Sequence, residues 1–204
     1  MIKNLEEDKG VMVFISHLGN SELLRGLAHS GETGVSKQFV VNAIADVGVT
    51  SKFNGLLKKI NSSATMHLFN ASGIGPDTMV QLQEKIAAGE MVVIAGDRIS
   101  ATSKNRFVDA PFLGHTAHFA YGAFLLAALL NAPTYFIFGL RKKPLSVRPQ
   151  YNFYAHKNSV TFDCSRKERE ERIKQMVAEY SKTLESLCLQ NPYQWYNFFD
   201  FWKQ

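Results

Sequence analysis

The sequence predicts an α/β fold in which a mostly parallel sheet is flanked by helices. Short, continuous apolar runs, typical of strands covered on both faces, recur along the chain. Longer segments between them carry apolar residues at helical spacing, with capping residues at their starts. The 204 residues suit a single domain, and no repeat, low-complexity segment or linker divides them. We therefore expect one domain over residues 1–204.

Five apolar runs predict the strands. They are Val11 to Ser16, Gln38 to Ile44, Thr65 to Phe69, Met91 to Ala95 and Thr134 to Phe138. Helices are expected from Asn20 or Ser21 to about His29, from Thr50 or Ser51 to about Ile60, and from Pro76 to Gly89. Strands that alternate with helices in this way form parallel sheets through right-handed crossovers.

The stretch from Ala110 to Leu140 contains no Asp, Glu, Lys or Arg. It is long enough to cross a bilayer, for which ~20 apolar residues suffice. However, Asn131-Ala132-Pro133 interrupts it, and proline does not continue a helix comfortably. We favour a buried helix from Ala117 to Leu130, a turn at the proline, and then the buried strand; a membrane span is the alternative.

The C-terminal third has a different pattern. Short antiparallel strands are expected from Val147 to Ala155 and from Ser159 to Phe162. Ser165 is expected to cap a long helix that runs to about Leu187, with the charged residues of its first turns in solvent. The tail from Pro192 to Trp202 is rich in aromatic residues.

Composition and charge narrow the classes of partner. The net charge of +5 favours anionic partners such as anionic lipid or an acidic carrier protein. The only compact basic cluster is Arg141-Lys142-Lys143, and no basic helix with interleaved aromatic residues is present, which argues against nucleic acid. The two cysteines, Cys164 and Cys188, lack metal-type spacing and indicate a reducing compartment, so neither a metal nor a cofactor is expected.

The most specific candidate for chemistry is the segment from His17 to Glu22. His17 ends a predicted buried strand, and Glu22 follows after four residues, in the first turn of the next predicted helix. This spacing allows the carboxylate to fold back onto the imidazole, where it would fix the tautomer and stabilise the imidazolium. The alternative is a surface glutamate and a core histidine bonded to the backbone.

A second candidate is Gly96-Asp97-Arg98, directly after another predicted strand. The carboxyl ends of parallel strands are where such folds bind ligands, so Asp97 and Arg98 are expected near His17. Arg98 could hold a phosphate or carboxylate, and Asp97 could position a hydroxyl; the alternative is an internal ion pair. Because the sequence has no Gly-x-Ser-x-Gly nucleophile elbow, His17 is expected to activate a hydroxyl of the substrate.

Together these segments resemble the bacterial lipid A biosynthesis acyltransferases of the lysophospholipid acyltransferase superfamily. His17-Leu18-Gly19-Asn20 with Glu22 resembles the family's first motif, a histidine followed after four residues by an acid. Met91 to Ser100 resembles a later block, and Phe112-Leu113-Gly114, Ala132-Pro133 and Gln194-Trp195 follow in the family's order. The resemblance covers roughly Val11 to Trp202.

The resemblance implies a glycerol-3-phosphate acyltransferase-like fold at the cytoplasmic face of the inner membrane, attached peripherally. It implies transfer of a fatty acyl group from an acyl carrier protein or coenzyme A thioester to a lipid hydroxyl. His17 would be the general base and Glu22 its partner, with Asn20, Arg25, Asp97 and Arg98 as candidates for binding substrate. The partners would be the acyl donor, a lipid acceptor and an anionic membrane surface.

The chain departs from the family pattern at its start, where about a hundred residues with a hydrophobic anchor usually precede the first motif. We therefore expect a fragment or a short form. Two other functions remain open: a non-catalytic module that binds acyl lipid or carrier protein, and a thioesterase or hydrolase in which water replaces the lipid hydroxyl.

Overall fold

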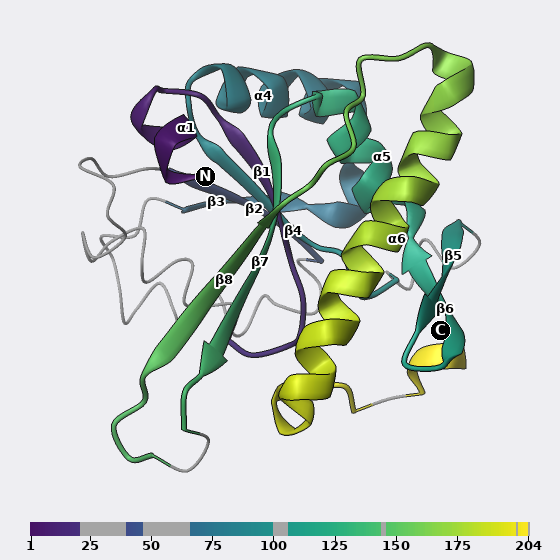
Figure 1. Cartoon of the computed structure of the whole chain (residues 1–204). Coiled ribbons are helices and arrows are strands. Elements are labelled where there is room, and N and C mark those ends of the chain that lie inside the picture. The colour runs from purple at the N-terminus through teal and green to yellow at the C-terminus, as the bar shows by residue number, and fades with distance from the viewer. Residues whose placement is uncertain (21–39, 47–65, 100–105, 144–145, 199, 204) are drawn as a thin grey trace.

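The structure is a computed structural model, and it describes residues 1–20, 40–46, 66–99, 106–143, 146–198 and 200–203. Its centre is a six-stranded sheet in the order β3-β2-β4-β1-β7-β8 (Figure 1). The strands are β1 (Val11–Ile15), β2 (Val41–Ala45), β3 (Met66–Asn70), β4 (Met91–Ala95), β7 (Thr134–Arg141) and β8 (Tyr151–Lys157). All neighbouring strands run parallel except β8, which pairs antiparallel with β7 at one edge. The predicted α/β fold with a mostly parallel sheet is confirmed.

Helices cover the sheet, and the core divides into two clusters. The helices of the described residues are α1 (Ile2–Glu6), α4 (Pro76–Ala87), α5 (Tyr121–Leu130) and α6 (Arg166–Gln190). One face of the sheet packs against buried side chains of α4, α5 and α6, in a large cluster rich in phenylalanine. The other face has a smaller cluster that includes Leu5 of α1. Because β1 is covered on both faces, its residues are almost all buried, as its continuous apolar run predicted.

The uncharged stretch forms a hairpin, a helix and a strand. The predicted turn at Asn131 and Pro133 is confirmed, since Asn131 adopts a left-handed conformation after α5 and β7 begins at Thr134. The helix begins at Tyr121, so the predicted start at Ala117 is wrong. Residues before it form β6 (His115–Ala120), which pairs with β5 (Phe107–Phe112) in an antiparallel hairpin. No helix in the described parts of the chain combines the length and apolar character needed to cross a membrane.

The C-terminal third matches the prediction in part. Ser165 and Glu168 form a reciprocal capping box, which fixes the start of α6 where the sequence placed it. The antiparallel strand begins at Tyr151 and ends at Lys157, and residues 159–162 form no strand, so that second predicted strand is wrong. Short 3-10 helices complete the fold at η1 (Ala71–Gly73), η2 (Pro192–Gln194) and η3 (Phe201–Lys203).

The aromatic tail is only partly exposed. Trp195 and Phe201 pack with Phe112 of the hairpin, with ring centroids 5.1–5.4 Å apart, and Trp202 packs against His115. Tyr193 and Phe198, by contrast, are 91% and 89% exposed. The helices predicted after Ser21 and over 50–60 lie outside the described residues.

Candidate functional site

The register between β1 and β4 brings two functional side chains together. In this pair Ile15 is aligned with Ala95, so both strands end at the same level. His17 and Asp97 each lie two residues beyond these ends and therefore emerge side by side, although 80 residues separate them in the sequence. They lie at the carboxyl edge of the sheet, where parallel α/β folds bind their ligands.

Asp97 holds His17 through both its ring and its backbone. One carboxylate oxygen lies 2.9 Å from Nδ1 of the ring, and the other accepts the backbone N–H of His17 at 2.7 Å. Because a carboxylate accepts hydrogen bonds, Nδ1 carries the proton and Nε2 is left as the basic nitrogen. Asp97 is only 1% exposed, whereas the His17 side chain is 36% exposed. The pair thus has a buried acid and a base that solvent can reach.

Two titratable side chains of α6, Tyr180 and Cys188, lie near enough to Asp97 to be affected by its charge. The Tyr180 hydroxyl, on α6, donates to the carbonyl of Ile15 at 2.8 Å. Burial, followed by the negative charge of Asp97, raises the pKa of Tyr180 well above its usual value. The same two causes, in the same order, raise the pKa of Cys188 to about 12. Both groups therefore stay protonated and neutral near pH 7.

The loop after β1 is held between β7 and the C-terminal tail. Gly19 has a φ of +76°, and a Cβ at this position would lie 2.1 Å from the Gly139 carbonyl oxygen, so only glycine fits. Its N–H donates to the Gln194 carbonyl at 2.8 Å, and the next N–H, of Asn20, donates to Gly139 at 2.9 Å. The N–H of Tyr196 donates to the carbonyl of His17 itself at 2.9 Å. These bonds fix the backbone from His17, the candidate base, to Asn20.

Two side chains fasten this tail segment in turn. The Gln194 amide bonds both backbone groups of Arg141: its oxygen accepts the N–H at 2.8 Å, and its nitrogen donates to the carbonyl at 3.0 Å. Gln194 is 5% exposed, so water does not compete freely for these bonds. Arg98 donates from Nη2 to the Tyr196 carbonyl at 2.9 Å. We call residues 194–196 the strap, because they tie the His17 loop to the end of β7.

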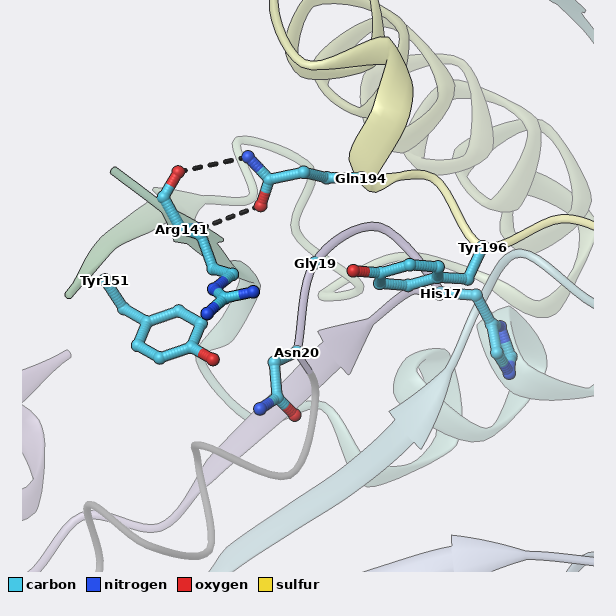
Figure 2. A pocket seen from close by; sticks show the side chains of 7 residues that line it. All are labelled: His17, Gly19, Asn20, Arg141, Tyr151, Gln194 and Tyr196. Carbon is cyan, nitrogen blue, oxygen red and sulfur yellow. Dashed lines mark hydrogen bonds between the residues drawn. The ribbon is translucent and has the colours of Figure 1, made fainter. Parts of the chain in front are cut away.

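A cavity of about 310 Å³ opens beside the loop (Figure 2). It is lined by His17, Gly19, Asn20, Arg141, Tyr151, Gln194 and Tyr196. In Figure 2 the Arg141 guanidinium points toward Tyr151, the Asn20 side chain points downward from the loop, and Tyr196 lies between these residues and the His17 ring. The strap and the end of β7 therefore form the walls of the cavity next to the candidate base.

The predicted site residues fall into two groups. The structure brings His17, Asp97, Arg98 and Asn20 to one edge of the sheet, as the sequence predicted. Asp97, expected to bind substrate, contacts the His17 ring, and Arg98 contacts the strap. Glu22 and Arg25 lie outside the described residues. The partnership of Glu22 with His17 thus stays a prediction, and the partner seen at Nδ1 is Asp97.

Sequence reasoning missed the contributions of three residues. Gln194 had been noted only as part of a motif, and Arg141 only as part of a basic cluster. Tyr151 was expected in a strand, with no role. Their common signal is weak, since each is a single polar residue at the end of an element, and only the folded chain shows that they meet.

The geometry suits proton transfer at a histidine that an acid orients. Among the described residues, the His17 ring bonds no serine, threonine or cysteine, and the neighbouring Ser16 hydroxyl accepts the Leu18 N–H instead. In the same part of the chain, no three His, Cys, Asp or Glu side chains are grouped so that they could hold a metal ion. Comparison with known proteins adds no family: no family model matches the chain, and no curated protein matches it.

Proposed function

We propose that this protein is an acyltransferase that moves a fatty acyl group from a thioester donor to a hydroxyl of a lipid, with His17 as general base. The observation that carries the proposal is the pairing of His17 Nδ1 with the buried Asp97 at the carboxyl edge of the sheet. This pairing leaves Nε2 to accept a proton, and Nε2 has no hydrogen-bond partner among the described residues. An oriented base that bonds no serine, threonine or cysteine of the described residues suits a reaction in which the substrate supplies the nucleophile.

The proposed reaction balances with two substrates and one histidine. The acceptor hydroxyl gives its proton to Nε2 as its oxygen attacks the thioester carbonyl. The tetrahedral intermediate then collapses, the carbon–sulfur bond breaks, and the thiolate leaves. The imidazolium returns the proton to the departing sulfur, so His17 ends the cycle neutral. Asp97 stabilises the transient imidazolium through Nδ1–H and does not itself take up a proton.

Sequence resemblance supports the more specific parts of the proposal. We assign the chain a glycerol-3-phosphate acyltransferase-like fold, with an acyl carrier protein or coenzyme A thioester as donor and a lipid or glycolipid as acceptor. The net charge of +5 is consistent with anionic partners and with peripheral attachment to the cytoplasmic face of an inner membrane. Glu22 keeps a proposed part in the site through the spacing of its motif.

The test is acyl transfer by the purified chain. Radiolabelled acyl coenzyme A or acyl carrier protein is supplied with total bacterial lipid, and labelled lipid is separated from free acid. His17→Ala should lower transfer by about 10²–10⁴-fold, the usual contribution of a general base. His118→Ala is a matched control, because His118 also bonds an aspartate through Nδ1 but lies on the β5–β6 hairpin. Equal transfer by the His17 variant and the native chain would refute the mechanism.

The same assay separates the two other functions. A thioesterase would release labelled free acid at the same rate with and without lipid, in a reaction that still needs His17. A binding module would release no product, and the His17 variant would retain the labelled donor as well as the native chain does. The geometry favours catalysis over binding, because holding an acyl group does not require a histidine oriented by a buried carboxylate.

A further inference from the structure

We infer that Arg141, Tyr151 and Asn20 form a subsite for a phosphate group of a substrate, next to the proposed base. Three features of the cavity beside His17 carry this inference: the chemistry of its lining, the way Arg141 is held, and its position. The inference deepens the proposed function. The catalytic test described below rests on that function, whereas the phosphate-binding test does not.

The lining of the cavity provides donors and one positive charge. Arg141 contributes a guanidinium, Asn20 an amide, and Tyr151 and Tyr196 a hydroxyl each, and none of the described lining residues carries a carboxylate. Figure 2 shows Arg141 and Tyr151 on the same side of the loop that carries Asn20. A guanidinium with neighbouring neutral donors recognises phosphate well, because its planar fork can form two parallel hydrogen bonds to the oxygens.

Arg141 is held in place before any ligand arrives. Its backbone N–H and carbonyl are both bonded by the buried Gln194 amide. Its guanidinium donates from Nη2 to the Ser146 carbonyl at 3.1 Å, which directs the side chain along the β7–β8 connection. A side chain whose orientation is fixed loses less conformational entropy on binding. The adjacent Lys142 and Lys143 are exposed and line no part of the cavity.

The position of the cavity links it to the reaction. His17 itself is among the lining residues, and the loop that carries it also carries Asn20. A volume of about 310 Å³ accommodates a phosphate with part of the group that bears it. A phosphate bound there would share the cavity with His17, with Tyr196 between Arg141 and the His17 ring (Figure 2). Arg98, which the sequence suggested for this task, instead bonds the Tyr196 carbonyl of the strap.

The binding test uses inorganic phosphate and nuclear magnetic resonance of the full chain labelled with ¹⁵N. Sodium phosphate is titrated at constant ionic strength, with sodium chloride replacing it in the reference. The amide signals of Gly19, Asn20, Arg141 and Tyr151 should shift and saturate with phosphate but not with chloride. Arg141→Ala should weaken this binding by about 10- to 100-fold, as expected for hydrogen bonds to a charged group. Arg148→Ala, which changes an exposed arginine in the same connection, should not weaken it.

The Arg141 variant should fold, because Gln194 bonds the backbone of residue 141 and not its side chain. Tyr151→Phe provides a second test, since it removes one donor and leaves the ring. Phosphate shifts that are absent, or that are the same in the native chain and the Arg141→Ala variant, would overturn the inference. Loss of saturable shifts in Arg141→Ala, together with their retention in Arg148→Ala, would support it.

The catalytic test identifies which substrate carries the phosphate. If it belongs to the acceptor, Arg141→Ala should raise the KM for the acceptor alone; if it belongs to the donor, the KM for the thioester alone should rise. Unchanged KM values for both would overturn the substrate role. If the chain binds phosphate through Arg141 but transfers no acyl group, the proposed function is refuted and the phosphate site is supported. The failure of one proposal can therefore be distinguished from the failure of the other.

Discussion

At the scale of single residues, the function proposed for His17 depends on one buried carboxylate. Asp97 accepts both the ring N–H and the backbone N–H of His17, so it sets the tautomer and the position of the ring at once. Its 1% exposure keeps water from competing for these bonds. This arrangement explains why an acid 80 residues away in the sequence is the partner of the histidine in the folded chain.

Replacing Asp97 by asparagine should show how much of its effect on the reaction comes from its charge and how much from its shape. The amide is nearly the same size but cannot stabilise the imidazolium, and its NH₂ group favours the wrong tautomer. We expect Asp97→Asn to lower the transfer rate by roughly 10²–10⁴-fold, mainly in kcat. Asp109→Asn, at the exposed His118 pair on the hairpin, is the matched control and should leave the rate unchanged. A kcat for Asp97→Asn within twofold of native would argue against the role given to Asp97.

Cys188 offers a test of the buried environment around Asp97. Burial, then the charge of Asp97, raises the pKa of this thiol to about 12, and its exposure is only 3%. Because the thiolate is the reactive form, Cys188 should resist iodoacetamide at pH 8 in the native protein, while the half-buried Cys164 reacts first. Mass spectrometry of peptides before and after unfolding in urea measures both sites. Equal labelling of the two thiols in the native state would contradict this picture.

The raised pKa of Cys188 also affects the free energy of unfolding at alkaline pH. The unfolded thiol loses its proton near its ordinary value of 9.0, whereas the folded one keeps it up to about 12. The unfolded state therefore gains relative stability across this interval. Below pH 9 this group has no effect on the free energy of unfolding; between pH 9 and 12 that free energy should fall. The raised pKa of Tyr180 acts in the same direction at high pH.

At the scale of elements, the strap is what joins the C-terminal tail to the site. Its Trp195 forms an isolated β-bridge with Leu18. Its backbone carbonyls accept hydrogen bonds from the Gly19 N–H and from the Arg98 side chain. The loop after β1 is bridged in addition to β7 through Gly19 and Gly139. The His17 loop thus lies between a strand of the main sheet and a segment that follows the last long helix.

Gln194→Ala should loosen this arrangement. It removes two hydrogen bonds to the backbone of Arg141 and leaves buried groups without partners, which costs about 1–3 kcal/mol. Urea unfolding should show this loss, and acyl transfer should fall more than the small unfolded fraction explains. Gln190→Ala, an exposed glutamine at the end of α6, is the control and should change neither quantity. An unchanged unfolding midpoint for Gln194→Ala would mean that the strap does not depend on this side chain.

At the scale of the whole molecule, basic and aromatic residues gather near the same edge as the proposed site. Lys142 and Lys143 follow β7 directly and are exposed. Tyr193, next to the strap, and Phe198, beyond it, are also almost fully exposed. The aromatic residues Trp195, Phe201 and Trp202 pack internally, so only part of the tail is available to contact a bilayer. Exposed aromatic and basic side chains together suit an anionic lipid surface.

Vesicle co-sedimentation tests this proposed attachment. The native chain should bind vesicles that contain anionic lipid, and binding should weaken as salt rises, with each basic residue near the surface contributing ~1 kcal/mol. Reversing the charges of Lys142 and Lys143 should weaken binding, and Tyr193→Ala with Phe198→Ala should weaken it further. Reversing Lys167 and Lys174, two exposed lysines of α6, gives the same change in net charge and should have a smaller effect. Absence of binding at every salt concentration would refute attachment through this surface.

Much of the fold follows from local patterns in the sequence. The run from Met91 to Ala95 is a strand with the predicted bounds, because its side chains are buried on both faces and need no alternation. The start of α6 was predictable from Ser165 and Glu168, since capping depends on residues only a few positions apart. The hairpin of β5 and β6 was missed, because the uncharged stretch that begins at Ala110 continues through β6 into α5 and has no turn signal at Tyr121.

The sequence by itself determined that His17 and Asp97 each lie at or just beyond the end of a buried strand, because strand ends are set by local patterns. It did not determine that they touch. That depended on the order of strands in the sheet, which places β4 beside β1 in a register that aligns Ile15 with Ala95. Strand order and register depend on how all the elements pack together, so only the tertiary structure decided the partner of His17. The same holds for the strap and for Arg141, which lie 53 residues apart until the chain folds.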